Sequence, residues 1–129
     1  MKIEHVAIWS NDIDRLRDFY VQYFGASSNN KYINKKKGFS SYFLSFEDGS
    51  RLELMSVTNL VAFPGESNIN YVGMAHFAIS VGSSAKVDGL TALLKQNGFK
   101  VVDGPRTTGD GYYESIILDP DKNRIEITI

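Results

Sequence analysis

The sequence predicts an α+β fold built from two tandem βαβββ modules. Three observations lead to this prediction. Segments rich in Val, Ile, Phe and Tyr are separated by turn residues, as in short strands. One segment in each half has apolar residues at helical spacing, and the order of segments is the same in both halves. A chain of 129 residues that is 43% hydrophobic can bury a core without a structural metal. We therefore expect a single domain over residues 1–129, with modules at about 1–57 and 71–129 and a linker at about 58–70.

The helix of the first module is expected within residues 11–25, where apolar residues recur every three to four positions. Asn11 or Asp12 can cap its start, and Gly25 can end it in a left-handed conformation. The strands of this module are expected at residues 2–9, 39–47 and 50–57, with a weaker strand and a loop within residues 26–37.

The helix of the second module is expected within residues 83–98, with Ser83 or Ser84 as the cap and Gly98 as the stop. Strands are expected at residues 73–81, 99–107, 111–119 and 123–129. The turn "DPDKN" joins the last two strands.

Charge and composition narrow the classes of function. The net charge is −1 and the pI is near 6.1, so the strong basic bias of a nucleic-acid binder is absent. There are no cysteines, which excludes disulfides, thiolate metal ligands and cysteine nucleophiles. The sequence contains no signal-peptide apolar core and no apolar run long enough for a membrane span. A cytoplasmic protein that acts on a small molecule is expected.

Four ionisable residues occupy equivalent positions in the two modules. His5 and His76, the only histidines, lie in the first predicted strand of each module. Glu53 and Glu126 lie in the last predicted strand, 48 and 50 residues later. Side chains alternate between the two faces of a strand, so the branched apolar residues can pack on the helix while His and Glu point to the opposite face.

Two imidazoles and two carboxylates suit a borderline or hard divalent cation: Zn²⁺, Ni²⁺ or Co²⁺ foremost, with Mn²⁺ and Fe²⁺ as alternatives. If the two sheets curl toward each other, His5, Glu53, His76 and Glu126 can meet around such a metal. The competing interpretation is structural. Arg51 and Arg124 lie two residues from the glutamates on the same face and could pair with them.

The sequence resembles the vicinal oxygen chelate superfamily, which includes glyoxalase I, bleomycin-resistance proteins, fosfomycin-resistance enzymes and extradiol dioxygenases. The resemblance rests on "HVAI…D…FY…FG", "GSRLELMS", "HFAISV" and "GPRTTGDGYYESIILDPDKNRIEI", and it covers essentially the whole chain. It implies two βαβββ modules that form a cupped metal site, and members are commonly homodimers. The set His5, Glu53, His76 and Glu126 resembles the ligand set of small bacterial glyoxalase I.

The resemblance implies a lactoylglutathione lyase-like reaction. The hemithioacetal of methylglyoxal and a thiol is isomerised through an enediolate, with Glu126 as ligand and general base and Glu53 as a second proton carrier. Where small bacterial glyoxalase I has an arginine and an asparagine that bind glutathione, this chain has Trp9 and Val57. The thiol is therefore left open. The usual glycine of the last turn is Lys122, a tolerated turn change.

Four further residues are candidates for the substrate pocket: Trp9, Met55, Tyr112 and Tyr113. Trp9 and Met55 share the predicted face of His5 and Glu53, and one of the two tyrosines is expected to point inward. Two alternative functions remain. One is an Fe²⁺ dioxygenase or a fosfomycin-type thiol transferase, which would need only His5, His76 and Glu126. The other is a non-catalytic drug binder like the bleomycin-resistance proteins.

Overall fold

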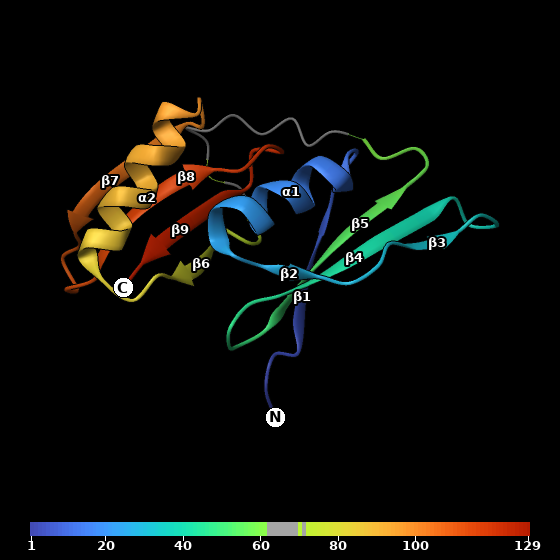
Figure 1. Ribbon diagram of the computed structural model, residues 1–129, viewed down its shortest axis with the longest axis horizontal. Coiled ribbons are helices and arrows are strands. Elements are labelled where there is room, and N and C mark those ends of the chain that lie inside the picture. Colours follow the sequence, from blue (N-terminus) through green and yellow to red (C-terminus); the bar gives the residue numbers. More distant parts are fainter. Residues whose placement is uncertain (62–69, 71) are drawn as a thin grey trace. The chain divides into compact units, whose positions relative to one another are not determined.

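The computed structural model describes residues 1–61, 70 and 72–129, and the chain divides into two compact units, Met1–Phe63 and Pro64–Ile129 (Figure 1). Each unit contains one mixed β-sheet and one long helix, which confirms the predicted α+β class. No helix among the described residues is long and apolar enough to cross a bilayer. The predicted linker falls largely on residues 62–69 and 71, which lie outside the described part of the chain.

The first unit has a mixed sheet in the order β1-β5-β4-β2, with β3 paired to β4. The edge strand β1 runs parallel to β5, and the remaining pairs are antiparallel. The weak strand expected from the sequence corresponds to two short ones, β2 and β3. The bounds are β1 His5–Trp9, α1 Ile13–Phe24, β2 Ser27–Ser28, β3 Tyr32–Asn34, β4 Phe39–Ser45 and β5 Arg51–Val57.

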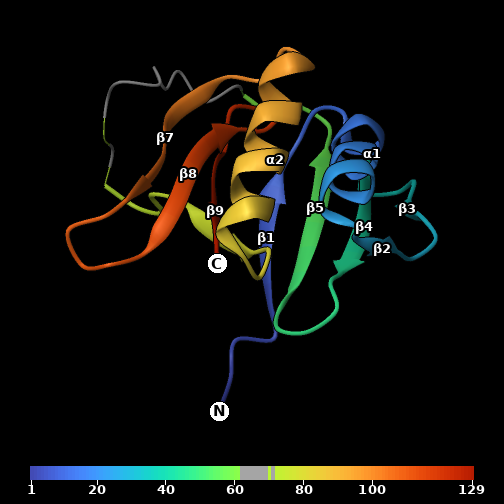
Figure 2. The same ribbon diagram turned by 60° about the vertical axis from the view of Figure 1, so that its left-hand side comes forward.

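Helix α1 forms where the capping residues predict it. The Asp12 side chain accepts a hydrogen bond from the backbone N–H of Arg15, and Gly25 takes the left-handed conformation that ends the helix. The helix packs on β4 and β5, as Figure 2 shows. Its Leu16 is completely buried, as is Leu54 of β5. One face of this sheet is therefore closed by the helix.

The second unit has the sheet order β6-β9-β8-β7, with β6 parallel to β9. This order matches that of the first unit, in which the first strand also pairs in parallel with the last long strand. The bounds are β6 Phe77–Ser80, α2 Ser84–Gln96, β7 Val101–Thr107, β8 Tyr113–Leu118 and β9 Arg124–Thr128.

Helix α2 covers one face of the second sheet, which is visible in Figure 1. Ser83 caps it by accepting from the backbone N–H of Lys86, so Ser83 rather than Ser84 is the cap. Leu94 of the helix is fully buried, as are Ile125 and Ile127 of β9. The residue of β9 between these isoleucines must face away from the helix, since strand side chains alternate.

Strand β7 follows an irregular path along β8. Gly104 has φ 75°, and the register of β7 with β8 shifts on both sides of Asp103. A Cβ on Gly104 would lie 2.5 Å from the backbone oxygen of Glu114, so only glycine permits this close approach. The bulge brings Arg106 opposite Glu114.

The first strand of each module begins later than the sequence pattern indicates. In the first module it was expected from residue 2 and starts at His5, and in the second it was expected from residue 73 and starts at Phe77. His76 consequently lies immediately before β6 and not within it. The strand alternation that was used to orient His76 therefore does not constrain it directly.

Candidate functional site

The open face of the first sheet carries His5 and Glu53. Glu53 pairs with Ala7 on one side and with Phe43 on the other, at the middle of the sheet. Its neighbours Leu52 and Leu54 are buried on the helix side. Glu53 therefore points to the face that α1 does not cover, as the alternating sequence predicts.

His5 and Glu53 lie close enough to act as a donor pair. The Nε2 atom of His5 is 3.8 Å from Oε2 of Glu53, and the Glu53 side chain is only 14% exposed. The Nδ1 atom of the same ring is 2.6 Å from Oε2 of Glu4. A carboxylate on Nδ1 fixes the ring's orientation and leaves Nε2 available, which is the usual arrangement behind a metal-binding histidine.

Glu4, and not Glu53, is the partner of Arg51. The Nε atom of Arg51 donates to Oε1 of Glu4 at 2.8 Å, and its guanidinium lies 4.2 Å above the ring of Phe43. The hydrogen bond to His5, followed by that from Arg51, lowers the pKa of the Glu4 carboxyl. The competing interpretation, in which Arg51 would pair with Glu53, is not what the structure shows.

The second unit repeats this arrangement with His76 and Glu126. Glu126 lies on β9 between Ile125 and Ile127, on the face opposite α2. Its Oε2 atom is 3.1 Å from Nε2 of His76, and its side chain is 15% exposed. Arg124, the other arginine of the competing interpretation, donates to Oδ1 of Asn70 at 3.0 Å.

Glu114 is a neighbour of Glu126 that the sequence analysis missed. It lies on β8 opposite Thr128, so it shares the face of Glu126, and its side chain is 12% exposed. Burial raises the pKa of the Glu114 carboxyl, and the negative charge of Glu126 and a hydrogen bond with it add to this effect. Arg106 opposes the shift from 4.0 Å. Strand alternation along residues 111–119 could have placed Glu114 on the open face.

The four candidate pocket residues are found on different faces. Trp9 and Met55 are register partners on the face of Glu53. Trp9 is 51% exposed, so it is not a core residue. Tyr112 precedes β8 and is exposed, whereas the Tyr113 hydroxyl donates to Asp88 of α2 at 2.7 Å. Tyr113 thus lies on the helix side of its sheet, away from Glu126, and we do not include it in the site proposed below.

Each unit supplies one imidazole and one sheltered carboxylate on its open face. Among the described residues, neither unit gathers three or more His, Asp or Glu side chains that could hold a metal. The donors themselves, imidazole nitrogen and carboxylate oxygen, fit Zn²⁺, Ni²⁺, Co²⁺, Mn²⁺ or Fe²⁺.

Comparison with models of known protein families assigns the chain to a superfamily. Residues 2–127 match the model of the Glyoxalase/Bleomycin resistance protein/Dioxygenase superfamily. The chain belongs to this superfamily, as the sequence motifs indicated. A search of curated proteins finds no match to the chain.

Solved structures show the same fold at low sequence identity. The trypanothione-dependent glyoxalase I of Leishmania major has a TM-score of 0.78 and 21% identity, over 99% of this chain and 86% of that one. A glyoxalase family protein from Enterococcus faecalis has a TM-score of 0.78 and 22% identity, over 99% and 97% of the two chains. A glyoxylase/bleomycin resistance protein/dioxygenase domain from Frankia sp. EAN1pec has a TM-score of 0.82 and 16% identity, over 100% and 97%.

Proposed function

We propose that the protein is a metal-dependent isomerase of the glyoxalase I type, which acts on the hemithioacetal of methylglyoxal and a small thiol. The observation that supports the proposal is the repeated pair: His5 with Glu53 in one unit and His76 with Glu126 in the other. These four residues would hold one divalent cation, with Zn²⁺, Ni²⁺ or Co²⁺ favoured by the donor set.

The reaction needs a base that removes a proton from carbon and returns it to the next carbon. When bound, a divalent cation would polarise the substrate oxygens and stabilise the negative charge that develops as this proton leaves. Glu126 would take the proton from the hydroxyl-bearing carbon and deliver it to the adjacent carbonyl carbon, while the hydroxyl proton moves to the neighbouring oxygen. The product is a thioester of a 2-hydroxy acid, and no oxidant or reductant is consumed.

The two carboxylates are suited to different parts of this task. Glu126 has the Glu114 carboxyl beside it, and burial and the charge of Glu126 raise the pKa of that carboxyl. Glu53 has Phe43 as its cross-strand neighbour and the imidazole of His5 as a polar neighbour on the open face of the same sheet. As the family resemblance implies, we assign Glu126 as the principal base and Glu53 as the second proton carrier.

The test is an assay of metal-stripped protein that is reloaded with Ni²⁺, Co²⁺ or Zn²⁺ and supplied with methylglyoxal and glutathione or other small thiols. Thioester formation should depend on the metal. Glu126→Gln should lower kcat/KM by at least about 10²-fold, the contribution of a positioned base. Glu47→Gln, at an exposed glutamate outside both pairs, is the matched control and should leave the rate unchanged.

Two results would count against the proposal in different ways. Tight metal binding without turnover of any hemithioacetal would exclude glyoxalase activity and leave the metal to another reaction. Failure to bind any metal would make the four residues structural and favour the drug-binding alternative. We also propose a homodimer, as the family resemblance implies, and a cytoplasmic location. Light scattering and cell fractionation would test these two proposals.

A further inference from the structure

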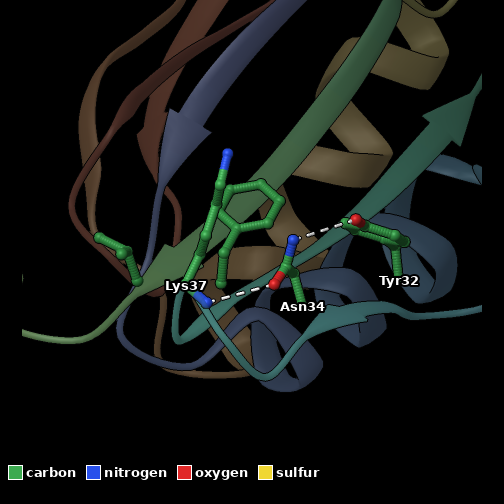
Figure 3. A pocket seen from close by; sticks show the side chains of 5 residues that line it. Tyr32, Asn34 and Lys37 are labelled. Atoms are coloured by element: carbon green, nitrogen blue, oxygen red, sulfur yellow. Dashed lines mark hydrogen bonds between the residues drawn. The ribbon is translucent and has the colours of Figure 1, made fainter.

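An open cavity of about 540 Å³ lies in the first unit, beyond the residues assigned to metal and proton transfer. It is formed by β3, the β3–β4 connection, the start of β4 and the end of β5. Figure 3 draws its lining side chains and labels Tyr32, Asn34 and Lys37, with the Lys37 amine pointing away from Asn34. The lining residues are Tyr32, Asn34, Lys37, Phe39 and Val57.

Strand register places this cavity on the same sheet face as Glu53. Val57 pairs with Phe39, which in turn pairs with Asn34, and the series Glu53, Met55, Val57 occupies alternate positions of β5. Alternate positions share one face, and each residue of a strand advances about 3.3 Å. The cavity therefore begins about 13 Å along the open face from the Glu53 position.

The wall of the cavity is aromatic. The rings of Tyr32 and Phe39 lie 6.2 Å apart, and Trp9 makes an edge contact with Phe39 at 6.4 Å. Tyr32 and Trp9 are both about half exposed, although large aromatic side chains gain most from burial. Such a wall offers a flat apolar group two ring surfaces on which to pack.

Lys37 is the one cation among the described residues that line the cavity. In the described part of the chain, no Asp or Glu forms an ion pair with its ammonium group. Its charge is thus available to an anionic ligand. Lys36, its neighbour, does not line the cavity.

The loop that carries Lys37 is held in place before any ligand binds. The Lys37 backbone N–H donates to the side-chain Oδ1 of Asn34 at 3.2 Å. Gly38 adopts a left-handed conformation with φ 59°, and a Cβ at this position would lie 2.8 Å from the Thr58 side chain. The Thr58 N–H donates to the Gly38 carbonyl oxygen at 3.1 Å. A preformed loop reduces the entropy that is lost on binding.

We propose that this cavity is a subsite for a substrate tail that contains an aromatic or similarly flat apolar group and ends in a carboxylate. The apolar group packs on Tyr32 and Phe39, and the carboxylate pairs with Lys37. As a statement about substrate, this rests on the function proposed above: the tail would belong to the thiol half of the hemithioacetal, whose reacting carbons would lie at Glu53.

The binding test uses 4-phenylbutyrate and its neutral analogue 4-phenylbutyramide. Trp9 is the only tryptophan of the chain and contacts Phe39, so its fluorescence reports on this cavity. The acid should bind about two- to fivefold more tightly than the amide, the range for an exposed ion pair. Lys37→Gln should abolish this preference, whereas Lys36→Gln should preserve it. Phe39→Ala should weaken both ligands.

Equal binding of acid and amide, or a preference that survives Lys37→Gln, would overturn the role of Lys37. Absence of saturable binding of either probe would overturn the subsite itself. The hemithioacetal assay on the same preparation separates the two proposals. Turnover without probe binding would refute only the subsite, whereas charge-dependent probe binding without turnover would refute the proposed reaction and retain an aromatic-acid site.

Discussion

Tyr42 joins α1 to the first sheet through its hydroxyl group, and its removal gives a sharp test of the structure. The ring is buried on the helix side of β4. Its hydroxyl donates to Oδ1 of Asp14 at 2.6 Å and accepts from Nη1 of Arg17 at 2.9 Å. Lys31 also bonds to Asp14, through Oδ2 at 2.6 Å. Tyr42→Phe removes one oxygen and leaves the ring in place.

The expected cost of Tyr42→Phe is about 1–2 kcal/mol of unfolding free energy at pH 7. Each hydrogen bond to a charged group contributes about 1.5–3 kcal/mol when its partner is left unsatisfied. The Asp14 side chain is 52% exposed, so water can replace the hydrogen bond that its carboxylate loses. The expected cost in unfolding free energy is therefore smaller than the sum for two buried hydrogen bonds. For a chain of this size, the loss corresponds to about 4–7 °C in Tm.

The pH dependence has a definite sign. Hydrogen bonds from Lys31, first, and then from Tyr42 lower the pKa of Asp14 below the ordinary 3.8. Stability from a lowered carboxyl pKa is present above the unfolded pKa and is lost as the pH falls through the folded pKa. The difference in unfolding free energy between wild type and Tyr42→Phe should therefore become smaller below about pH 4.

Urea denaturation followed by circular dichroism, from pH 7 down to pH 3, measures both effects. Tyr32→Phe is the matched control, because the Tyr32 side chain is exposed and its hydrogen bond to Asn34 is long, at 3.5 Å. The control should change the unfolding free energy by less than about 0.5 kcal/mol. A Tyr42→Phe cost no larger than that of the control, or one that grows under acid, would refute the reasoning.

Three further changes test other parts of the structure. Glu4→Gln should weaken metal binding about 10–100-fold in calorimetry, because it removes the carboxylate that orients His5; unchanged affinity would contradict this role. Leu54→Ala should cost about 2–5 kcal/mol in urea unfolding, and a cost below about 1 kcal/mol would mean that the site is not tightly packed. Lys122 has φ 70°, so Lys122→Gly should raise the unfolding free energy by about 0.5–1 kcal/mol; a loss of stability would show that the lysine side chain contributes.

Alternation along strands made the open faces predictable. Glu53 lies between two leucines and Glu126 between two isoleucines, and a period of two leaves each glutamate only one possible face once its neighbours are buried. The helix caps Asp12 and Ser83 were predictable for a similarly local reason, since their side chains bond to the backbone three residues ahead.

The residues that sequence reasoning missed depend on where strands begin and how they pair. Glu4 precedes β1, so strand alternation does not place its side chain on the face opposite His5. Its carboxylate instead contacts Nδ1 of the His5 ring. Glu114 becomes a neighbour of Glu126 only through the β8–β9 register. The turn between β8 and β9 is held by Asp119, which accepts hydrogen bonds from the backbone and the side chain of Asn123, four residues ahead.

Asp119 also shows what a structural carboxylate looks like in this protein. It is buried and accepts hydrogen bonds from the backbone N–H of Asp121 and from both the backbone and the side chain of Asn123. Burial of a carboxylate is tolerated when donors satisfy its oxygens in this way. The sheltered Glu53 and Glu126 have a different environment, since each faces an imidazole across an open sheet face, at 3.8 and 3.1 Å. A turn carboxylate with fixed donors has no capacity left for a ligand. Glu53 and Glu126 lie on inner strands and each faces an imidazole, with Glu114 as a further neighbour of Glu126. This contrast favours a ligand-binding role for the pairs over a structural one.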